Sequence, residues 1–140
     1  MTLEYHIPST PFPPNKILLG WIKTWNNKFE KLGANYVIPG HGHPTNMSQV
    51  RKYTHDYLVH LRNAIREHLD NGGELSSAYY VDQSSFSNLD TFKELATRNA
   101  GRVFEEMEYI AKRSKVSDLQ ITDANFGMFK EDILTAKKVS

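Results

Sequence analysis

The sequence predicts an α+β fold dominated by helices, with three to five helices and one or two short strands. Three long segments repeat apolar residues every three or four positions, as the buried face of an α-helix does. Two short β-prone runs each end at prolines or at a Pro-Gly pair, which is typical of a strand that leads into a turn. The 140 residues are enough for one domain with a real core, and a second independent domain is not expected.

The first strand is predicted at residues 3–7, because the prolines that follow it exclude regular pairing. The first helix is predicted from a cap at Asn15 to a stop at Gly33. Trp21 and Trp25 lie on its apolar stripe, so core packing explains them better than a stacking platform for a ligand does. The stripe consists of Leu18, Trp21, Ile22, Trp25, Phe29 and Leu32.

Residues 34–38 form the second β-prone run, predicted as a buried strand, and residues 39–45 follow it as a sharp loop. Asn46 and Gln49 then resemble a capping box at the start of a helix of roughly six turns, which the glycines at 72–73 end. The apolar stripe of this helix consists of Val50, Tyr53, Tyr57, Leu58, Leu61, Ala64, Ile65 and Leu69.

A short helix is predicted at residues 74–80 and a polar loop at residues 82–88. A last long helix is expected to begin near Asn88 and to end in the charged residues 112–115. Residues 126–136 are a further candidate helix at the end of the chain. The apolar face of the long helix consists of Phe92, Leu95, Ala96, Val103, Met107 and Ile110.

Asn99 falls on that apolar face, which predicts a buried polar side chain that needs hydrogen-bond partners. Glu105, Glu106 and Glu108 are interpreted as a solvated face, because neighbouring acids on a helix point in different directions. His55, His60 and His68 are spaced by five and eight residues, whereas helical metal ligands need spacings of three or four. We therefore assign these three histidines no metal role.

The composition narrows the classes of partner. Lys plus Arg number 17 and Asp plus Glu number 16, with both signs interspersed, so nucleic acid and anionic membranes are disfavoured. No secretory signal or membrane-spanning run is recognisable, and a cytoplasmic location is expected. Because the chain has no cysteine, any metal would have to be bound by His, Asp or Glu.

One motif carries chemistry, the run from Pro39 to Pro44 that contains His41 and His43. The glycines on either side of His41 allow a tight turn and clear space around the imidazole, as a metal ligand requires. From spacing alone, a turn with incidental histidines is an equally good interpretation, because two histidines do not complete a zinc site.

A strand followed by Pro-Gly-His-Gly resembles the last metal-binding motif of the metallo-β-lactamase-fold zinc hydrolases. The resemblance spans about residues 3–110 and is strongest to the zinc metallohydrolases of sulfur-oxidation and quinoprotein-relay systems. It rests further on His6-Ile7-Pro8, Gly20-Trp21-Ile22, Tyr57-Leu58, Leu61-Arg62, Gly72-Gly73, Arg98-Asn99 and Phe104-Glu105-Glu106-Met107-Glu108.

The resemblance implies the C-terminal half of an αββα sandwich, with residues 1–113 as a partial domain and residues 114–140 as an extension. It identifies His41 as the one metal ligand that this chain retains, whereas His43 matches no ligand of the family. The His-x-His-x-Asp-His motif, a further His and a bridging Asp have no counterpart here. No catalytic residue is therefore assigned, and tight zinc binding by the chain alone is not expected.

Two functions follow as hypotheses. The first is a partial zinc-dependent hydrolase, inactive alone, whose His41 completes a metal site only with another chain. The second is a non-catalytic helical module for oligomerisation or protein interaction that derives from the same fold. Both predict a homo-oligomer or a complementary chain as the partner, because half a sandwich leaves a face and a sheet edge uncovered.

Overall fold

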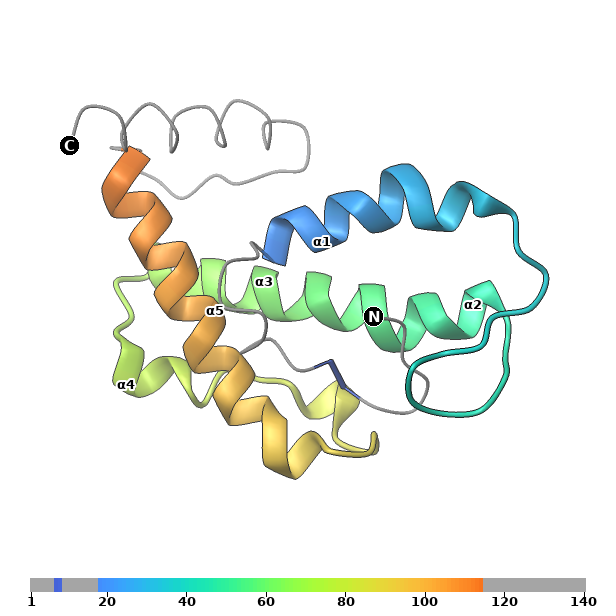
Figure 1. Ribbon diagram of the computed structural model, residues 1–140. Coiled ribbons are helices and arrows are strands. Elements are labelled where there is room, and N and C mark those ends of the chain that lie inside the picture. The colour runs from blue at the N-terminus through green and yellow to red at the C-terminus, as the bar shows by residue number, and fades with distance from the viewer. Residues whose placement is uncertain (1–6, 9–17, 115–140) are drawn as a thin grey trace.

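The computed structural model of the chain describes residues 7–8 and 18–114, and within them the protein is built almost entirely from helices (Figure 1). β pairing in these residues is limited to isolated bridge positions, such as the antiparallel bridge between Val37 and Thr45. The predicted dominance of helices is confirmed. No helix in the described part of the chain has both the length and the apolar character to cross a membrane.

The first long helix runs through residues 18–32 as three consecutive segments. These are α1 (Leu18–Thr24), a π-helical turn η1 (Trp25–Phe29) and a 3-10 turn η2 (Glu30–Leu32). The helix ends where Gly33 adopts the left-handed region with a φ of 64°. The predicted stop is confirmed, and glycine suits it because a Cβ disfavours this backbone angle.

The second long helix has the same construction and consists of α2 (Met47–Val50), the π-helical turn η3 (Arg51–His55) and α3 (Asp56–Asp70). Asn46 caps its start, because its side-chain Oδ1 accepts the backbone N–H of Gln49 at 3.0 Å. This is half of the predicted capping box. Gly72, with a φ of 75°, follows the end of the helix as expected.

The remaining elements are α4 (Leu75–Ala78), a 3-10 turn η4 (Ser84–Phe86) and the long helix α5 (Phe92–Ser114). α5 begins at Phe92, later than the predicted start near Asn88. Leu89 is buried, with 5% of its surface exposed, and Thr91 has a φ of 63°, which is outside the helical region. The chain therefore first places Leu89 in the core and only then enters the helix.

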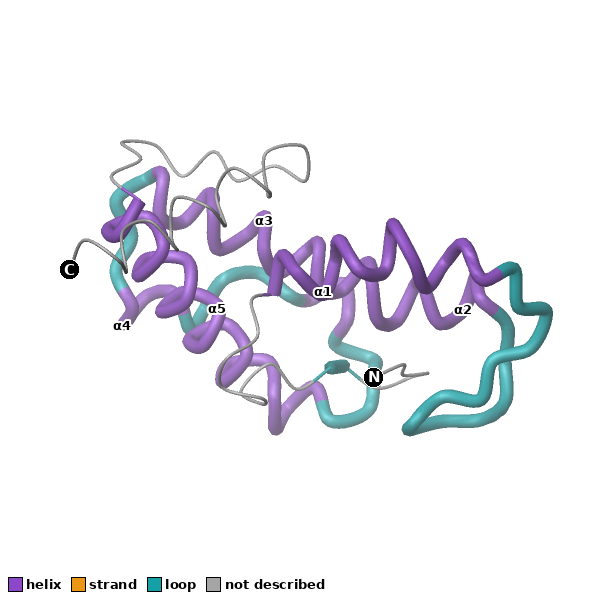
Figure 2. Tube along the Cα trace, turned by 45° about the horizontal axis from the view of Figure 1, so that its top comes forward, coloured by secondary structure: helices purple, strands orange, loops and turns teal. Residues whose placement is uncertain are grey.

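α3 lies at the centre of the arrangement. The helix of residues 18–32 runs beside it in the opposite direction, and α5 crosses it on another side (Figures 1 and 2). α4 packs against α5. The loop of residues 33–46, at the far end of the helical pair from α5, joins the two long helices (Figure 2).

The buried apolar residues form two clusters of unequal size. The first cluster joins α1, α3, α4 and α5, and its fully buried members include Tyr57, Leu61, Ile65, Val103 and Phe104. The second cluster lies between η1, α2 and the loop that joins the two long helices. It consists of Trp25, Val37 and Val50, with Phe29 and Met47 packed against them.

The segment 34–38 departs from the prediction of a buried strand. Val37 is buried at 8% exposure, but Tyr36 and Ile38 are 87% and 82% exposed. Side chains alternate between the two faces of an extended chain, and here only the face toward the helices is covered. The segment therefore pairs at a single bridge and shows its other apolar face to solvent.

Several predictions concern residues that lie outside the described ones. They are the strand at 3–7 apart from Ile7, the cap at Asn15, the extension 114–140 beyond Ser114, and the helix at 126–136. Ile7 is 2% exposed and belongs to the first cluster.

Candidate functional site

The loop that carries His41 is closed by the bridge of Val37 with Thr45. The N–H of Val37 donates to the Thr45 carbonyl at 2.9 Å, and the N–H of Thr45 donates back to the Val37 carbonyl at 2.9 Å. Within the loop Pro39 is buried, and Gly42 has a φ of 107°, an angle that residues with a Cβ rarely adopt. The glycine after His41 is therefore required by the local turn.

The bridge also fixes the loop to the helices, because the Val37 side chain packs in the second cluster with Trp25 and Val50. His41 and His43 are both exposed. An exposed imidazole on an anchored loop is accessible to an ion or to a second polypeptide. The structure thus places the predicted ligand where external groups can reach it.

A complete zinc centre does not fit the described residues. Among residues 7–8 and 18–114, no group of three or more His, Cys, Asp or Glu side chains could hold a metal ion. One imidazole does not bind zinc tightly. It also does not provide the coordination by several ligands that a zinc ion needs to activate a bound water. Within this part of the chain, His41 can act as one ligand of a site that other groups must complete.

His60 and His68 line a surface groove of about 680 Å³ between α3 and residues 71–82, which contain α4 and are called the α4 segment below. The Nε2 of His60 lies 2.7 Å from the Asp82 carbonyl, and the Nε2 of His68 lies 3.0 Å from the Glu74 carbonyl. Since a carbonyl only accepts, each Nε2 carries a proton and donates it. These two nitrogens therefore serve as hydrogen-bond donors that tie α3 to the α4 segment.

The carboxylate of Asp82 stands at the rim of the same groove. Hydrogen bonds from the Ser84 hydroxyl and the Ser84 backbone N–H lower the pKa of Asp82, and His60 adds to this effect. The Ser84 N–H donates at 2.8 Å. This geometry fits an Asx turn that starts η4, so the acid has a structural role.

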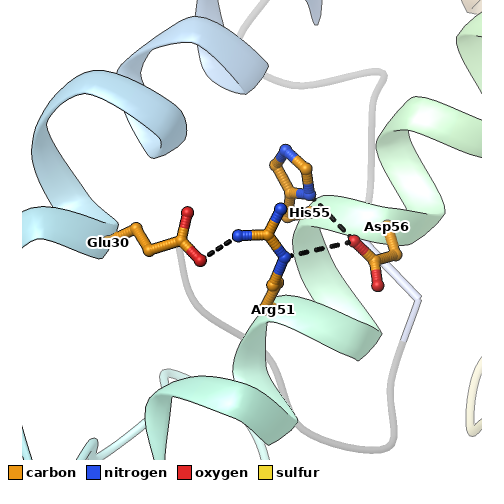
Figure 3. A network of polar contacts seen from close by, with 4 residues as sticks. All are labelled: Glu30, Arg51, His55 and Asp56. Carbon is orange, nitrogen blue, oxygen red and sulfur yellow. Dashed lines mark hydrogen bonds and ion pairs between the residues drawn. The ribbon is translucent and has the colours of Figure 1, made fainter.

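A second polar constellation joins the two long helices, with Glu30 on η2, Arg51 and His55 on η3, and Asp56 at the start of α3 (Figure 3). The Arg51 guanidinium donates a hydrogen bond to the carboxylate of Glu30. The Nε of Arg51 lies 3.8 Å from the Oδ1 of Asp56. The same Asp56 oxygen accepts from the Nδ1 of His55 at 2.9 Å. The carboxylates are one-third to one-half exposed, so solvent screens them and the network chiefly orients the side chains.

Behind this network lie two buried polar atoms without a hydrogen-bond partner, the Nε1 of Trp25 and the Nε2 of His55. The two rings stack at a tilt, with their centroids 5.8 Å apart. Buried polar atoms normally find partners, and each one left alone opposes folding. The end of the molecule that carries the His41 loop is therefore polar in its interior without being fully satisfied.

Between α3 and α5 lies a buried polar network whose side chains are bonded to one another or to backbone carbonyls. The Tyr57 hydroxyl donates to the Gln83 Oε1 at 2.7 Å and accepts from the Asn99 Nδ2 at 3.0 Å. Asn99 also donates to the Pro8 carbonyl at 2.6 Å, and Gln83 donates to the Ala96 carbonyl at 2.9 Å. Burial raises the pKa of Tyr57, which keeps the hydroxyl protonated. The prediction that Asn99 is buried and bonded is confirmed; Gln83, in a segment predicted as a polar loop, gave no signal.

Glu106 corrects the interpretation of a solvated acidic face. Its carboxylate is largely buried and accepts the backbone N–H of Leu18 at the start of α1 at 2.7 Å. Burial raises the pKa of Glu106 to about 7, although the Leu18 N–H and Arg102 act in the opposite direction. Glu105, its neighbour, is exposed as predicted.

Comparisons of the chain with protein-family models, with curated proteins and with solved structures find no match in any of the three.

Proposed function

We propose that this chain supplies His41 as one ligand to the zinc centre of a hydrolase with the metallo-β-lactamase fold, and that it is inactive alone. In this proposal the chain forms the C-terminal part of the αββα sandwich, and the other ligands come from outside residues 18–114. The observation that supports the proposal best is the exposed His41 on a loop whose two stems are joined by the bridge of Val37 with Thr45.

The geometry supports a ligand role in two ways. A metal ligand has to be held in place before the ion arrives, and the bridge and the buried Pro39 restrict the loop that presents His41. A ligand to a shared site must also be accessible to the partner, and His41 is exposed. The helix-dominated architecture is compatible with the helical layer that such a sandwich carries on one face.

A second candidate function is a non-catalytic helical module that binds another polypeptide. The exposed apolar side chains of Tyr36 and Ile38, next to the His41 loop, favour it. The satisfied network around Tyr57 and Asn99 also favours it, because it gives the helices an interior of their own. Under this alternative His41 has no function.

Titration of the chain with Zn²⁺, followed by the side-chain ¹H–¹⁵N signals of its histidines, tests the ligand role. A quarter of the roughly 10–16 kcal/mol that four zinc ligands contribute together corresponds to a Kd of about 1 mM or weaker. We expect the His41 signals to shift first. The signals of His60 and His68 should shift less, because their Nε2 atoms donate to carbonyls.

The variants His41→Ala and His43→Ala form a matched pair in the same loop. His41→Ala should remove the zinc response, and His43→Ala should leave the response of His41 in place. If His41 does not respond to millimolar zinc while other histidines do, the ligand role fails and the binding module becomes the better function. Tight binding of one zinc per chain, lost in His41→Ala, would contradict the statement that this chain lacks a complete site.

A further inference from the structure

The backbone of residues 36–38 has one paired side and one open side. Both hydrogen-bonding groups of Val37 face Thr45. Successive residues of an antiparallel ladder direct their N–H and C=O groups to opposite sides, so those of Tyr36 and Ile38 face away from Thr45. Neither residue makes a hydrogen bond within the part of the chain that the structure describes. The segment is therefore a short strand edge.

The side chains on this edge are apolar and face solvent. Tyr36 and Ile38 lie on the face opposite Val37, and they are 87% and 82% exposed. Aromatic and β-branched residues are those that pair best across neighbouring strands. An open edge that carries such residues without a charged one is a template for another strand.

The edge is complementary to itself. We propose that residues 36–38 pair antiparallel with residues 36–38 of a second copy of this chain, about a two-fold axis at Val37. The N–H and C=O of Tyr36 then bond those of Ile38 in the second copy, and the reverse pair does the same, which makes four backbone hydrogen bonds. Each Tyr36 ring packs against the Ile38 side chain opposite it.

The pairing closes on itself and stops at two copies. The chain bends at Asn35 and again at Gly40, so the extended run that can pair is limited to the few residues between them. The other side of Val37 is already occupied by Thr45. An interface in which both copies use the same patch uses up the edge, and the product is a closed dimer without open ends.

The size of the contact sets its strength. Even complete coverage of the two exposed side chains of each copy would bury only roughly 600–700 Å² in total, well below the 1,200–2,000 Å² of stable complexes. A weak dimer is therefore expected, with dissociation in the range of about 0.1 mM. The two His41 loops leave the paired strands in opposite directions, so this dimer does not bring the two imidazoles together and is independent of the zinc proposal.

Sedimentation equilibrium of the full chain between about 5 μM and 1 mM tests the dimer. Tyr36→Lys and Ile38→Glu should each weaken association about tenfold or more, because each places a charge against an apolar side chain. In the double variant, the new lysine of each copy lies opposite the new glutamate of the other copy only in the proposed register. This variant should therefore recover association at low salt and lose it again in roughly 1 M NaCl. Tyr80→Lys, at a second exposed tyrosine, should associate like the original chain.

Concentration-dependent shifts of the Tyr36 and Ile38 amide signals in the original chain provide a measurement that needs no variant. A chain that stays monomeric up to about 1 mM, or oligomers that grow beyond two copies, would overturn the proposal. So would single variants that associate as well as the original chain, or a double variant without recovery at low salt. His41→Ala should leave the dimer unchanged, so a failed zinc titration does not decide this test.

Discussion

The polar network between α3 and α5 and the end of the molecule that holds the His41 loop differ in how their buried polar groups are bonded. Between α3 and α5 the side chains of Tyr57, Gln83 and Asn99 are buried and bonded to one another or to backbone carbonyls. Beside the loop, the Nε1 of Trp25 and the Nε2 of His55 are buried without partners. Apolar side chains follow the same division, since Phe104 is buried and Ile38 is exposed.

The difference indicates where the free energy of folding is concentrated. A bonded polar network inside a large apolar cluster stabilises one arrangement of the helices and opposes others. Unpaired buried polar atoms and exposed apolar side chains oppose folding locally, and they are tolerated where contact with another molecule serves function. In both proposed functions the loop end is the part that binds, and the α3–α5 part supports it.

Asn99→Ala should produce the largest effect, a loss of about 3 kcal/mol in the free energy of unfolding. The substitution removes the hydrogen bonds to the Tyr57 hydroxyl and to the buried Pro8 carbonyl. Urea denaturation followed by circular dichroism measures the loss. Asn63→Ala, at an exposed position of α3, is the control and should change stability by less than about 0.5 kcal/mol. Equal effects of both variants would remove the contrast between the two regions.

The free energy of unfolding should depend on pH through Glu106, the buried acid of α5 that accepts the Leu18 N–H of α1. The pKa of Glu106 is raised from 4.5 to about 7, so the folded state binds its proton more tightly than the unfolded state does. The stabilisation of the folded state by this tighter proton binding is complete below pH 4.5 and is lost as the pH rises through 7. Between pH 5 and 7 the free energy of unfolding should fall by roughly 2 kcal/mol relative to Glu106→Gln.

The measurement for Glu106 is urea denaturation at half-unit steps of pH. Glu105→Gln changes an exposed acid on the same helix and should keep the pH dependence of the original chain. A Glu106→Gln curve parallel to the original curve would show that the buried carboxylate does not control this part of the profile.

Trp25→Phe should produce the smallest effect, a change of less than about 1.5 kcal/mol in the free energy of unfolding. The indole N–H that it removes has no partner, so no hydrogen bond is lost and only packing changes. Thermal denaturation beside Asn99→Ala makes the comparison direct. A loss as large as that of Asn99→Ala would show that the loop end is as well satisfied as the polar network between α3 and α5.

The helices could be predicted from the sequence because their signals are local. Apolar residues at helical spacing marked the stripes, and Gly33 and Gly72 marked the ends through a backbone angle that favours glycine. Asn46 marked a start by its capping side chain. Asn99 stood out as a polar residue on an apolar face, which made its burial predictable.

Features that depend on distant contacts could not be predicted. The burial of Glu106 depends on the Leu18 N–H, 88 positions away in the chain, whereas its sequence neighbours are also acidic. The exposure of Ile38 depends on which face of segment 34–38 packs against the helices, and that face carries Val37. At the candidate site, the loop around His41 could be predicted from the sequence, but the described residues contain no group of three or more side chains that could hold a metal ion.

The π-helical turn η3 has a consequence for how one helix serves two interiors. A π turn holds an extra residue compared with an α turn, and one residue corresponds to about 100° of rotation around the axis. Around this turn three consecutive residues, Tyr53 to His55, are all buried. The extra residue rotates the buried face of the helix, so that Val50 packs in the second cluster and Leu61 in the first. Deletion of one residue in Arg51–His55 would remove this rotation, and the two ends of the helix could not both face their clusters.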